Sequence, residues 1–313
     1  MAHTLAGAAL GEAGLKEKSG LGLATLMIAA NIPDLDAIAL VFGENLAFRR
    51  GLTHGPIGLL LLPVLLTLAM LGFDKWQARR GKRPPDRLPV RAGWLLLLAY
   101  IGALSHPALD FLNTYGVRCL APFSDRWFYG DTLFIIDVWL WTVLAIGTFW
   151  AQRRRRGGVK RPRLPAQAAI LILCAYIAGM GAFSAASESA ARAAVAQAGY
   201  GTAELAIASP PPVDPFRRRL IYRTEDRRVG WGEVALGGPV VLDAPPRPDA
   251  MDDPRIAAAA AGSKPLRDFL FWSRVPFARF EGGEVIVSDA RYTDRFASSN
   301  FTVRAPVSAA DRE

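Results

Sequence analysis

The 313-residue chain contains only two cysteines and three histidines. Two cysteines cannot form a disulfide framework, and because Cys174 lies in an apolar run and Cys119 in a loop-like segment, we expect two free thiols. The chain also lacks a Walker loop and the patterns GxGxxG, GxSxG and CxxC. Nucleotide-binding and serine-hydrolase classes are therefore unsupported. The start of the chain has no basic region followed by a long apolar core, so no secretory signal peptide is predicted.

Charge is unevenly distributed along the chain. Residues 204–313 contain 16 Lys/Arg and 16 Asp/Glu, so the net charge of +9 arises entirely in residues 1–203. Most of the excess lies in two short segments between apolar runs, 74–91 and 153–163, with seven Lys/Arg each. Basic loops between apolar runs are typical of membrane topology signals and not of a nucleic-acid footprint. We therefore expect no nucleic-acid partner.

Long apolar runs are concentrated in residues 1–190. A transmembrane helix needs about 20 apolar residues, and four segments meet this requirement, at 55–73 and at about 92–112, 132–151 and 166–187. Residues 4–14 and 19–33 are shorter and predict a helical hairpin that dips into the membrane or packs on other helices. The sequence thus predicts a mainly α membrane protein, a helical bundle with about four transmembrane helices and an N-terminal helical hairpin.

The last third of the chain has the composition of a soluble domain. Alternating apolar and polar residues predict strands at 218–226, 228–237, 284–296 and 301–307. Proline near the start of 253–262 and of 264–273 favours two short helices. We therefore predict a membrane-embedded helical domain with a metal site at 1–190 and a small α+β domain at 204–313, joined by a helix at 188–200.

The basic loops also predict orientation. Both should be cytoplasmic, and the loop 113–131, with only Arg118 and Arg126, should lie on the other side. His54, His106, Asp110 and Asp131 would then gather at the non-cytoplasmic face. The expected protein is a multi-pass inner (plasma) membrane protein whose site and C-terminal domain face away from the cytoplasm.

The His106–Asp110 pair is the strongest candidate for a functional site. The two residues are four apart, which places both side chains on one helix face. Ionisable groups within a hydrophobic span are costly and tend to be functional. Imidazole and carboxylate are the ligands that a zinc-like cation prefers, and a mixed set can hold one or more divalent cations with a position open for water. His3, His54 and the Pro-Asp-x-Asp carboxylates Asp34 and Asp36 are further candidates.

Each weaker candidate has a structural alternative. His3 could cap a helix, and Asp34 and Asp36 could end a helix and start a turn. Asp137 lies in the third predicted span, where it could act as a general base, orient a ligand, or pair with Arg126.

Three further charged residues also have more than one interpretation. Asp131, at the start of the third predicted span, could orient a ligand or act as a base. Arg49 and Arg50 could be topology charges or could bind an anionic group such as a phosphate.

Four motifs together resemble the YdjM-like family of membrane-bound metal-dependent hydrolases: His3-Thr4, Pro33–Asp36, Arg50–His54 and Ser105–Gly116. The resemblance covers roughly residues 1–150. The family is thought to be distantly similar to the zinc-dependent phospholipase C and single-strand nuclease superfamily. The resemblance implies a divalent metal ion, with zinc expected, and metal ligands at His3, Asp34, Asp36, His54, His106 and Asp110. Many members have HRG where this chain has Arg49-Arg50-Gly51, which leaves the number of metals open.

The function expected from these features is metal-dependent hydrolysis, by a metal-activated water, of a phosphoester in a lipid or envelope-associated substrate. Asp131, Asp137 and Arg50 are the predicted catalytic residues, and Arg49 or Arg126 could also neutralise substrate charge. The alternative is a non-enzymatic envelope membrane protein whose His/Asp cluster is structural. A transporter is less favoured, because the charged set is predicted at one face and not at mid-bilayer. The bilayer is the expected partner, and the sequence leaves the oligomeric state open.

Overall fold

The computed structural model describes residues 1–42, 48–293 and 300–307. It divides into two compact units, one comprising Met1–Gly43 and Phe48–Met180 and the other mainly Gly181–Glu313. The division falls inside one continuous helix, α6 (Leu164–Gln197). The predicted span at 166–187 and the predicted helix at 188–200 are therefore a single element.

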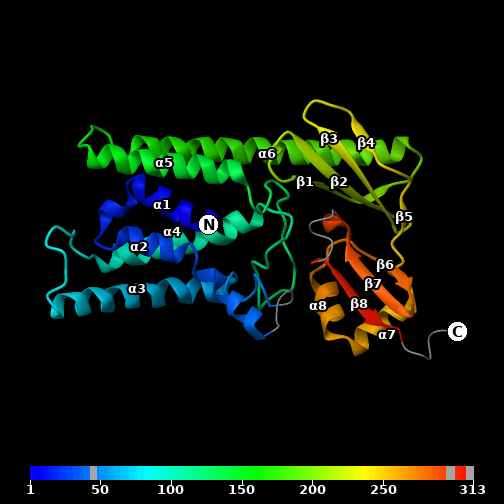
Figure 1. The fold of residues 1–313 in the computed structure, drawn as a ribbon, viewed down its shortest axis with the longest axis horizontal. Helices are drawn as coiled ribbons and strands as arrows, with labels where there is room; N and C mark the ends of the chain where they lie inside the picture. The colour runs from blue at the N-terminus through cyan, green and yellow to red at the C-terminus, as the bar shows by residue number, and fades with distance from the viewer. Residues whose placement is uncertain (43–47, 294–299, 308–313) are drawn as a thin grey trace. The chain divides into compact units, whose positions relative to one another are not determined.

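The regular elements of the first unit are all helices in the residues described (Figure 1). Its elements before α6 are α1 (Ala2–Glu12), η1 (Leu15–Lys18), α2 (Gly22–Ala29), η2 (Ile32–Phe42), α3 (Pro56–Arg79), α4 (Ala92–Phe111) and α5 (Val138–Arg156). Helix α1 packs on α2 and α5, and α4 packs on α2 and α3. The short helix α2 is thus enclosed by neighbours on several sides.

Glycines allow α2 to approach its neighbours closely. A Cβ atom on Gly7 of α1 or on Gly102 of α4 would lie 2.8 Å from the carbonyl oxygen of Leu26 in α2. Small residues at helix contacts permit this backbone approach and are typical of membrane helices. Leu26 is fully buried between them.

Three helices of the described chain are long and apolar enough to cross a membrane, namely α3, α4 and α6. The pair Gly22–Ala29 and Ile32–Ala39, bent by 41°, adds a fourth if it is counted as one span. The outward faces of these helices carry large apolar side chains such as Leu60, Leu65 and Leu171, as lipid contact requires. The prediction of a multi-span helical protein is confirmed, whereas a re-entrant hairpin stays a prediction.

The third predicted span, 132–151, differs from the observed helix. Asp137 caps α5 by accepting a hydrogen bond from the Leu140 amide at 2.8 Å, so the helix begins only at Val138. Its last turn consists of arginines from Arg153 onward. The apolar part between these limits is roughly 20 Å long at 1.5 Å per residue, shorter than the ~30 Å bilayer core. Accordingly, α5 is not among the described helices that satisfy the length and composition of a span.

The two basic turns, 80–91 and 157–163, lie at the same end of the first unit (Figure 1). Both contact η1 or the residues that follow it. The amide of Gly20 donates to the carbonyl of Pro89 at 3.0 Å, and Glu17 pairs with Arg155 at 2.9 Å and with Arg163. Asp110 lies near the opposite end of α4, beside the 112–137 connection.

The second unit contains two antiparallel sheets. The first has the order β1 (Ala203–Ser209), β2 (Arg217–Thr224), β3 (Arg228–Ala235), β4 (Val240–Leu242), with β5 (Arg247–Pro248) also paired to β3. The second has the order β6 (Pro276–Glu281), β7 (Glu284–Asp289), β8 (Thr302–Pro306). Helices α7 (Pro254–Gly262) and α8 (Lys264–Trp272) and the turn η3 (Ala290–Tyr292) complete it.

Several strands and both α-helices of this unit were predicted from the sequence. Strands β2, β3, β7 and β8 and helices α7 and α8 coincide with predicted segments, whereas β1, β4, β5 and β6 were not predicted. The prediction of a strand over 284–296 is wrong beyond Asp289, where β7 ends. The Asp289 side chain accepts a hydrogen bond from the Arg291 amide and so caps η3. The remainder of that segment, from residue 294, lies outside the described residues.

Candidate metal centre

His106 and Asp110 lie one turn apart on the buried face of α4, with side chains 0% and 4% exposed. The Nδ1 atom of His106 is 2.7 Å from the carbonyl oxygen of Ala30. A carbonyl can only accept, so Nδ1 carries the proton and Nε2 presents a lone pair. This Nε2 is buried and has no hydrogen-bond partner in the described chain. The pair therefore has the orientation of a metal-ligating histidine and its neighbouring carboxylate.

His54 is fully buried in a tight turn. Its backbone amide donates to the Gly51 carbonyl at 2.9 Å. Its Nδ1 lies 3.1 Å from the hydroxyl of Thr53 and 3.4 Å from Asp36 Oδ2. A proton on Nδ1 shared with that carboxylate leaves the lone pair on Nε2, which is 3.4 Å from Asp110 Oδ2. Asp36 therefore lies behind His54 and orients it, a different position from the direct ligand that the family resemblance implies.

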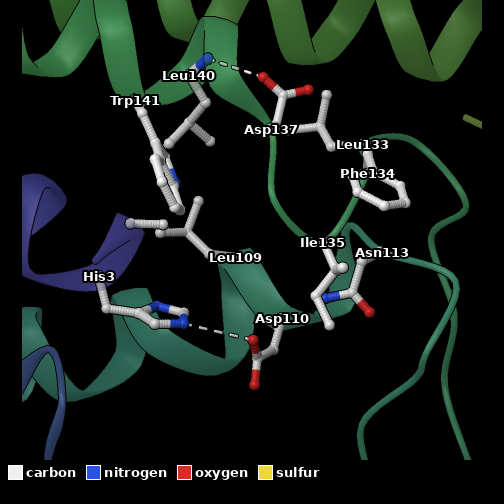
Figure 2. A pocket seen from close by; sticks show the side chains of 11 residues that line it. His3, Leu109, Asp110, Asn113, Leu133, Phe134, Ile135, Asp137, Leu140 and Trp141 are labelled. Atoms are coloured by element: carbon white, nitrogen blue, oxygen red, sulfur yellow. Dashed lines mark hydrogen bonds and ion pairs between the residues drawn. The ribbon is translucent and has the colours of Figure 1, made fainter. Parts of the chain in front are cut away.

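His3, in the first turn of α1, completes the set of three imidazoles. Its ring stacks on that of His106 with centroids 3.7 Å apart. Its Nε2 is 3.5 Å from Asp110 Oδ1, the contact drawn as a dashed line in Figure 2. Asp34 approaches from η2, with Oδ1 3.7 Å from His106 Nε2. Four separate segments of the first unit thus converge on one place.

The spacing of these atoms fits a divalent cation. With metal–ligand bonds of about 2.0–2.1 Å, tetrahedral ligand atoms lie about 3.3 Å apart. Asp110 Oδ2 lies 3.4 Å from His54 Nε2 and 3.5 Å from His106 Nε2. Both imidazole nitrogens are buried and lack a hydrogen-bond partner among the described residues, whereas Asp110 Oδ2 also faces Arg50 Nε at 3.0 Å. The potential ligands form two overlapping groups: His3, Asp34 and His106, and His54, His106 and Asp110.

Two arginines face the carboxylates of this cluster. Arg50 Nε is 3.0 Å from Asp110 Oδ2, and its Nη1 donates to Asn113 Oδ1 and the Gly116 carbonyl at 3.1 Å each. Its backbone amide donates to Asp36 at 2.6 Å.

Arg49 faces the other carboxylates. Its Nη2 donates to Asp34 at 3.1 Å, and its Nε lies 3.4 Å from Asp36. Three carboxylates against two guanidinium groups leave one net negative charge, which favours a cation at this place.

A small cavity of about 40 Å³ adjoins His3 and Asp110 and is also lined by Asn113 and Asp137 (Figure 2). It has room for a water molecule beside polar groups. Asp137, however, uses Oδ1 to cap α5 and accepts a hydrogen bond from the Tyr176 hydroxyl on Oδ2 at 3.0 Å. This pairing replaces the one with Arg126 that the sequence left open.

Asp131 belongs to the 112–137 connection, at a point where that connection returns to the C-terminal end of α4. It is buried and has a positive φ of 47°. The amides of Thr132 and Leu133, which follow it, both donate to the Leu112 carbonyl, at 2.8 and 2.9 Å. Among the described residues, the two ligand groups exclude Asp36, Asp131 and Asp137.

Two of the groups that orient the cluster, Asn113 and the Ala30 carbonyl, were not predicted from the sequence. Asn113 accepts from Arg50, and it belongs to the same SHPALDFLNTYG stretch as His106, so its position in that motif was an available signal. The Ala30 carbonyl has no signal of this kind, because any residue supplies the same atom. Its role depends only on the close contact between α2 and α4.

The fold and site define a class: a multi-span helical membrane protein with a buried His/Asp cluster capable of holding a metal ion. Residues 1–186, more than half of the chain, match the YdjM inner membrane protein family, and the chain belongs to that family. The match contains every residue of the cluster, confirms the resemblance seen in the motifs, and indicates the inner membrane as its location. No curated protein and no solved structure matches the chain.

Proposed function

We propose that this protein is a membrane-bound, metal-dependent hydrolase acting on a phosphoester. The observation that carries the proposal is the convergence of His54 Nε2 and His106 Nε2 on Asp110 Oδ2, at 3.4 and 3.5 Å, with both imidazole nitrogens buried and without a hydrogen-bond partner in the described chain. Unpaired polar atoms in a buried site are costly unless something binds them. A bound cation explains why all three face one another.

The proposed ligands are His54, His106 and Asp110, with His3 and Asp34 available for further coordination. Imidazole nitrogen and carboxylate oxygen suit zinc, which is the metal we propose. When bound, such a cation supplies Lewis-acid chemistry, activating water and offsetting charge on a phosphoester.

Residues around the ligands hold them in place. Asp36 fixes the tautomer of His54, and Ala30 that of His106. Arg50 is only 8% exposed and holds Asp110, so we assign it a positioning role in place of the substrate contact expected from sequence. Arg49 and Asp34 are 22% and 39% exposed and form the more accessible side of the cluster. Arg49 is therefore the arginine we propose for contact with a substrate phosphate.

The topology of the first unit supports a substrate outside the cytoplasm. The basic turns meet at one end of its helices, and Asp110 lies near the other end of α4 (Figure 1). If those turns are cytoplasmic, the cluster opens toward the opposite membrane face. A phosphoester of a lipid or an envelope component is then the accessible substrate class.

The test is metal analysis of protein purified in detergent, followed by assays on phosphodiester and phosphomonoester substrates. We expect the wild type to retain a stoichiometric divalent metal, and His106→Ala and Asp110→Ala to lose most of it. Asp125→Ala is the matched control, because that carboxylate is 78% exposed in the 112–137 connection and lies outside both ligand groups. Wild-type metal content in His106→Ala and Asp110→Ala would refute the assigned site.

The competing function is a non-enzymatic envelope protein whose cluster is structural. Arg49 and Arg50 already contact all three carboxylates of the cluster, which favours a stabilising ion-pair network. Protein that binds no metal and whose unfolding temperature is unchanged by chelators would support this alternative. Metal-dependent hydrolysis of any substrate in the panel would exclude it.

A further inference from the structure

The second unit contains a large open cavity that has no part in the proposed hydrolysis. Its volume is about 750 Å³, within the range of small-molecule sites. Its lining includes three arginines and, among the described residues, no carboxylate; the lining residues are Arg247, Phe277, Arg279, Ser288, Tyr292, Thr293, Thr302 and Arg304. A lining rich in arginine attracts an anion.

Sheet register explains how these side chains come together. In the β6–β7–β8 sheet, Phe277 pairs with Ser288, and Ser288 pairs with Thr302. Two residues along, Ile286 is flanked by Arg279 on one side and Arg304 on the other. Residues two apart on a strand share a face, so both rows lie on the same side of the sheet. Two guanidinium groups and two hydroxyls are therefore presented together.

The third arginine comes from the other sheet. Arg247 of β5 lies over the rings of Trp231 and Phe277, with its guanidinium carbon 4.8 and 4.7 Å from their centroids. Cation–π contacts fix the orientation of a guanidinium while leaving its N–H groups available. In the described part of the chain, no carboxylate pairs with Arg247, so the aromatic rings hold a charge that is not neutralised by an ion pair.

The other two arginines retain capacity for a ligand. Arg279 and Arg304 contact Glu281 at 3.0 Å and Glu284 at 3.6 Å, but their side chains are 50% and 58% exposed. Exposed pairs of this kind are weak and exchange readily for a better anion. The Ser288 and Thr302 hydroxyls are hydrogen-bonded to each other at 2.8 Å at the wall, so one of the two keeps its proton to donate to a ligand.

We propose that this cavity binds the phosphate group of a larger molecule. A phosphate offers several acceptor oxygens, which suits three guanidinium groups and a hydroxyl donor better than the two oxygens of a carboxylate. The cavity volume exceeds what inorganic phosphate fills, so the ligand carries an organic part beside Phe277 and Tyr292. The ligand is either a soluble phosphorylated molecule or a phospholipid headgroup. This site stands whether or not the first unit is a hydrolase.

The experiment measures binding to the full chain in detergent by isothermal titration calorimetry. The probes are inorganic phosphate, glycerol 1-phosphate and short-chain phosphatidylglycerol below its micellar concentration. We expect saturable binding, with glycerol 1-phosphate or phosphatidylglycerol tighter than inorganic phosphate, and weakening as salt rises. Arg247→Gln and Arg304→Gln should each reduce affinity about tenfold, as loss of one charge-assisted contact implies.

The matched control is Arg217→Gln, which removes one charge from an exposed arginine of β2 that does not line the cavity. Arg304 is so exposed that its replacement leaves the sheet folded, which near-ultraviolet circular dichroism checks. If Arg247→Gln unfolds the unit, Arg304→Gln alone decides. No binding of any probe, or an equal loss in the control, would overturn the proposal. Tighter binding of phosphatidylglycerol identifies a lipid headgroup, and tighter binding of glycerol 1-phosphate identifies a soluble ligand.

Discussion

Individual side chains at the cluster have roles that their residue type alone does not reveal. Asp137 lines the cavity beside His3, yet both of its oxygens are engaged, one as the cap of α5 and one by Tyr176. Asp137→Ala should lower stability by about 1 kcal/mol or somewhat more, since loss of an N-cap typically costs that amount. Asp137→Asn should lose less, because asparagine also caps helices. Both variants should keep the wild-type metal content. Metal analysis and thermal unfolding of each variant check these expectations.

The contrary outcome would restore the catalytic role predicted from sequence. If Asp137→Asn is as stable as the wild type and binds metal but no longer hydrolyses substrate, the carboxylate acts in the reaction and not only as a cap. Asp131 can be compared in the same way through Asp131→Asn, since its predicted role as a base is still a prediction.

At the scale of elements, the contact between α2 and α4 connects helix packing to the cluster. Gly102 meets α2 at Leu26 and Ala29, and four residues later His106 binds the Ala30 carbonyl. Gly102→Ala should push the helices apart and weaken the His106–Ala30 hydrogen bond, so we expect reduced metal occupancy with every ligand still present. Gly93→Ala is the control, because nothing lies within 4 Å of a Cβ there on the same helix. Equal metal content in both variants would show that the packing does not position His106.

The junction of β7 and η3 predicts a pH dependence of the second unit. Asp289 is fully buried, with Arg291 Nε at 2.8 Å and the Ser273 hydroxyl at 2.5 Å. Burial by itself raises the pKa of Asp289, but the Arg291 charge and these hydrogen bonds together hold the pKa below its ordinary value. The stabilisation is therefore complete above pH ~4, the ordinary carboxylate value, and is lost as pH falls through the lower folded-state pKa.

Thermal unfolding of the second unit measured from pH 7 to 2.5 checks this dependence. Stability should be nearly constant to about pH 4 and decline below it. Asp289→Asn should cost about 3 kcal/mol or more at pH 7, since it leaves the buried Arg291 unpaired. Glu281→Gln, at a side chain 58% exposed, should change little. A variant Asp289→Asn as stable as the wild type at neutral pH would contradict the role of this pair.

At the scale of the whole molecule, orientation in the membrane decides which compartment the cluster serves. In a background without Cys119 and Cys174, single cysteines can be placed at Phe123, which is 74% exposed, and at Lys82 in the first basic turn. A membrane-impermeant maleimide added to intact spheroplasts should label Phe123→Cys but not Lys82→Cys. Labelling of both should follow permeabilisation. The reverse pattern would place the cluster at the cytoplasmic face.

Much of the architecture and most of the cluster follow from local sequence. Uncharged runs near 20 residues predict α3, α4 and the first part of α6, because only a helix satisfies its backbone in lipid. His106 and Asp110 stood out because ionisable groups in an apolar helix need a partner. Helix α5 was misjudged at its start, since hydropathy alone did not show that Asp137 would cap it.

Sequence by itself therefore determined that this chain is a multi-span membrane protein and which histidines and carboxylates were candidates for one site. Only the tertiary structure decided how they meet, because the direction of a lone pair depends on what binds the other ring nitrogen. The Ala30 carbonyl and Asp36 decide this for His106 and His54, and Arg50 holds Asp110 from the side. The arginine cavity likewise exists only through strand register and the approach of Arg247 from a different sheet. Contacts between residues so distant along the chain leave no periodic trace in its sequence.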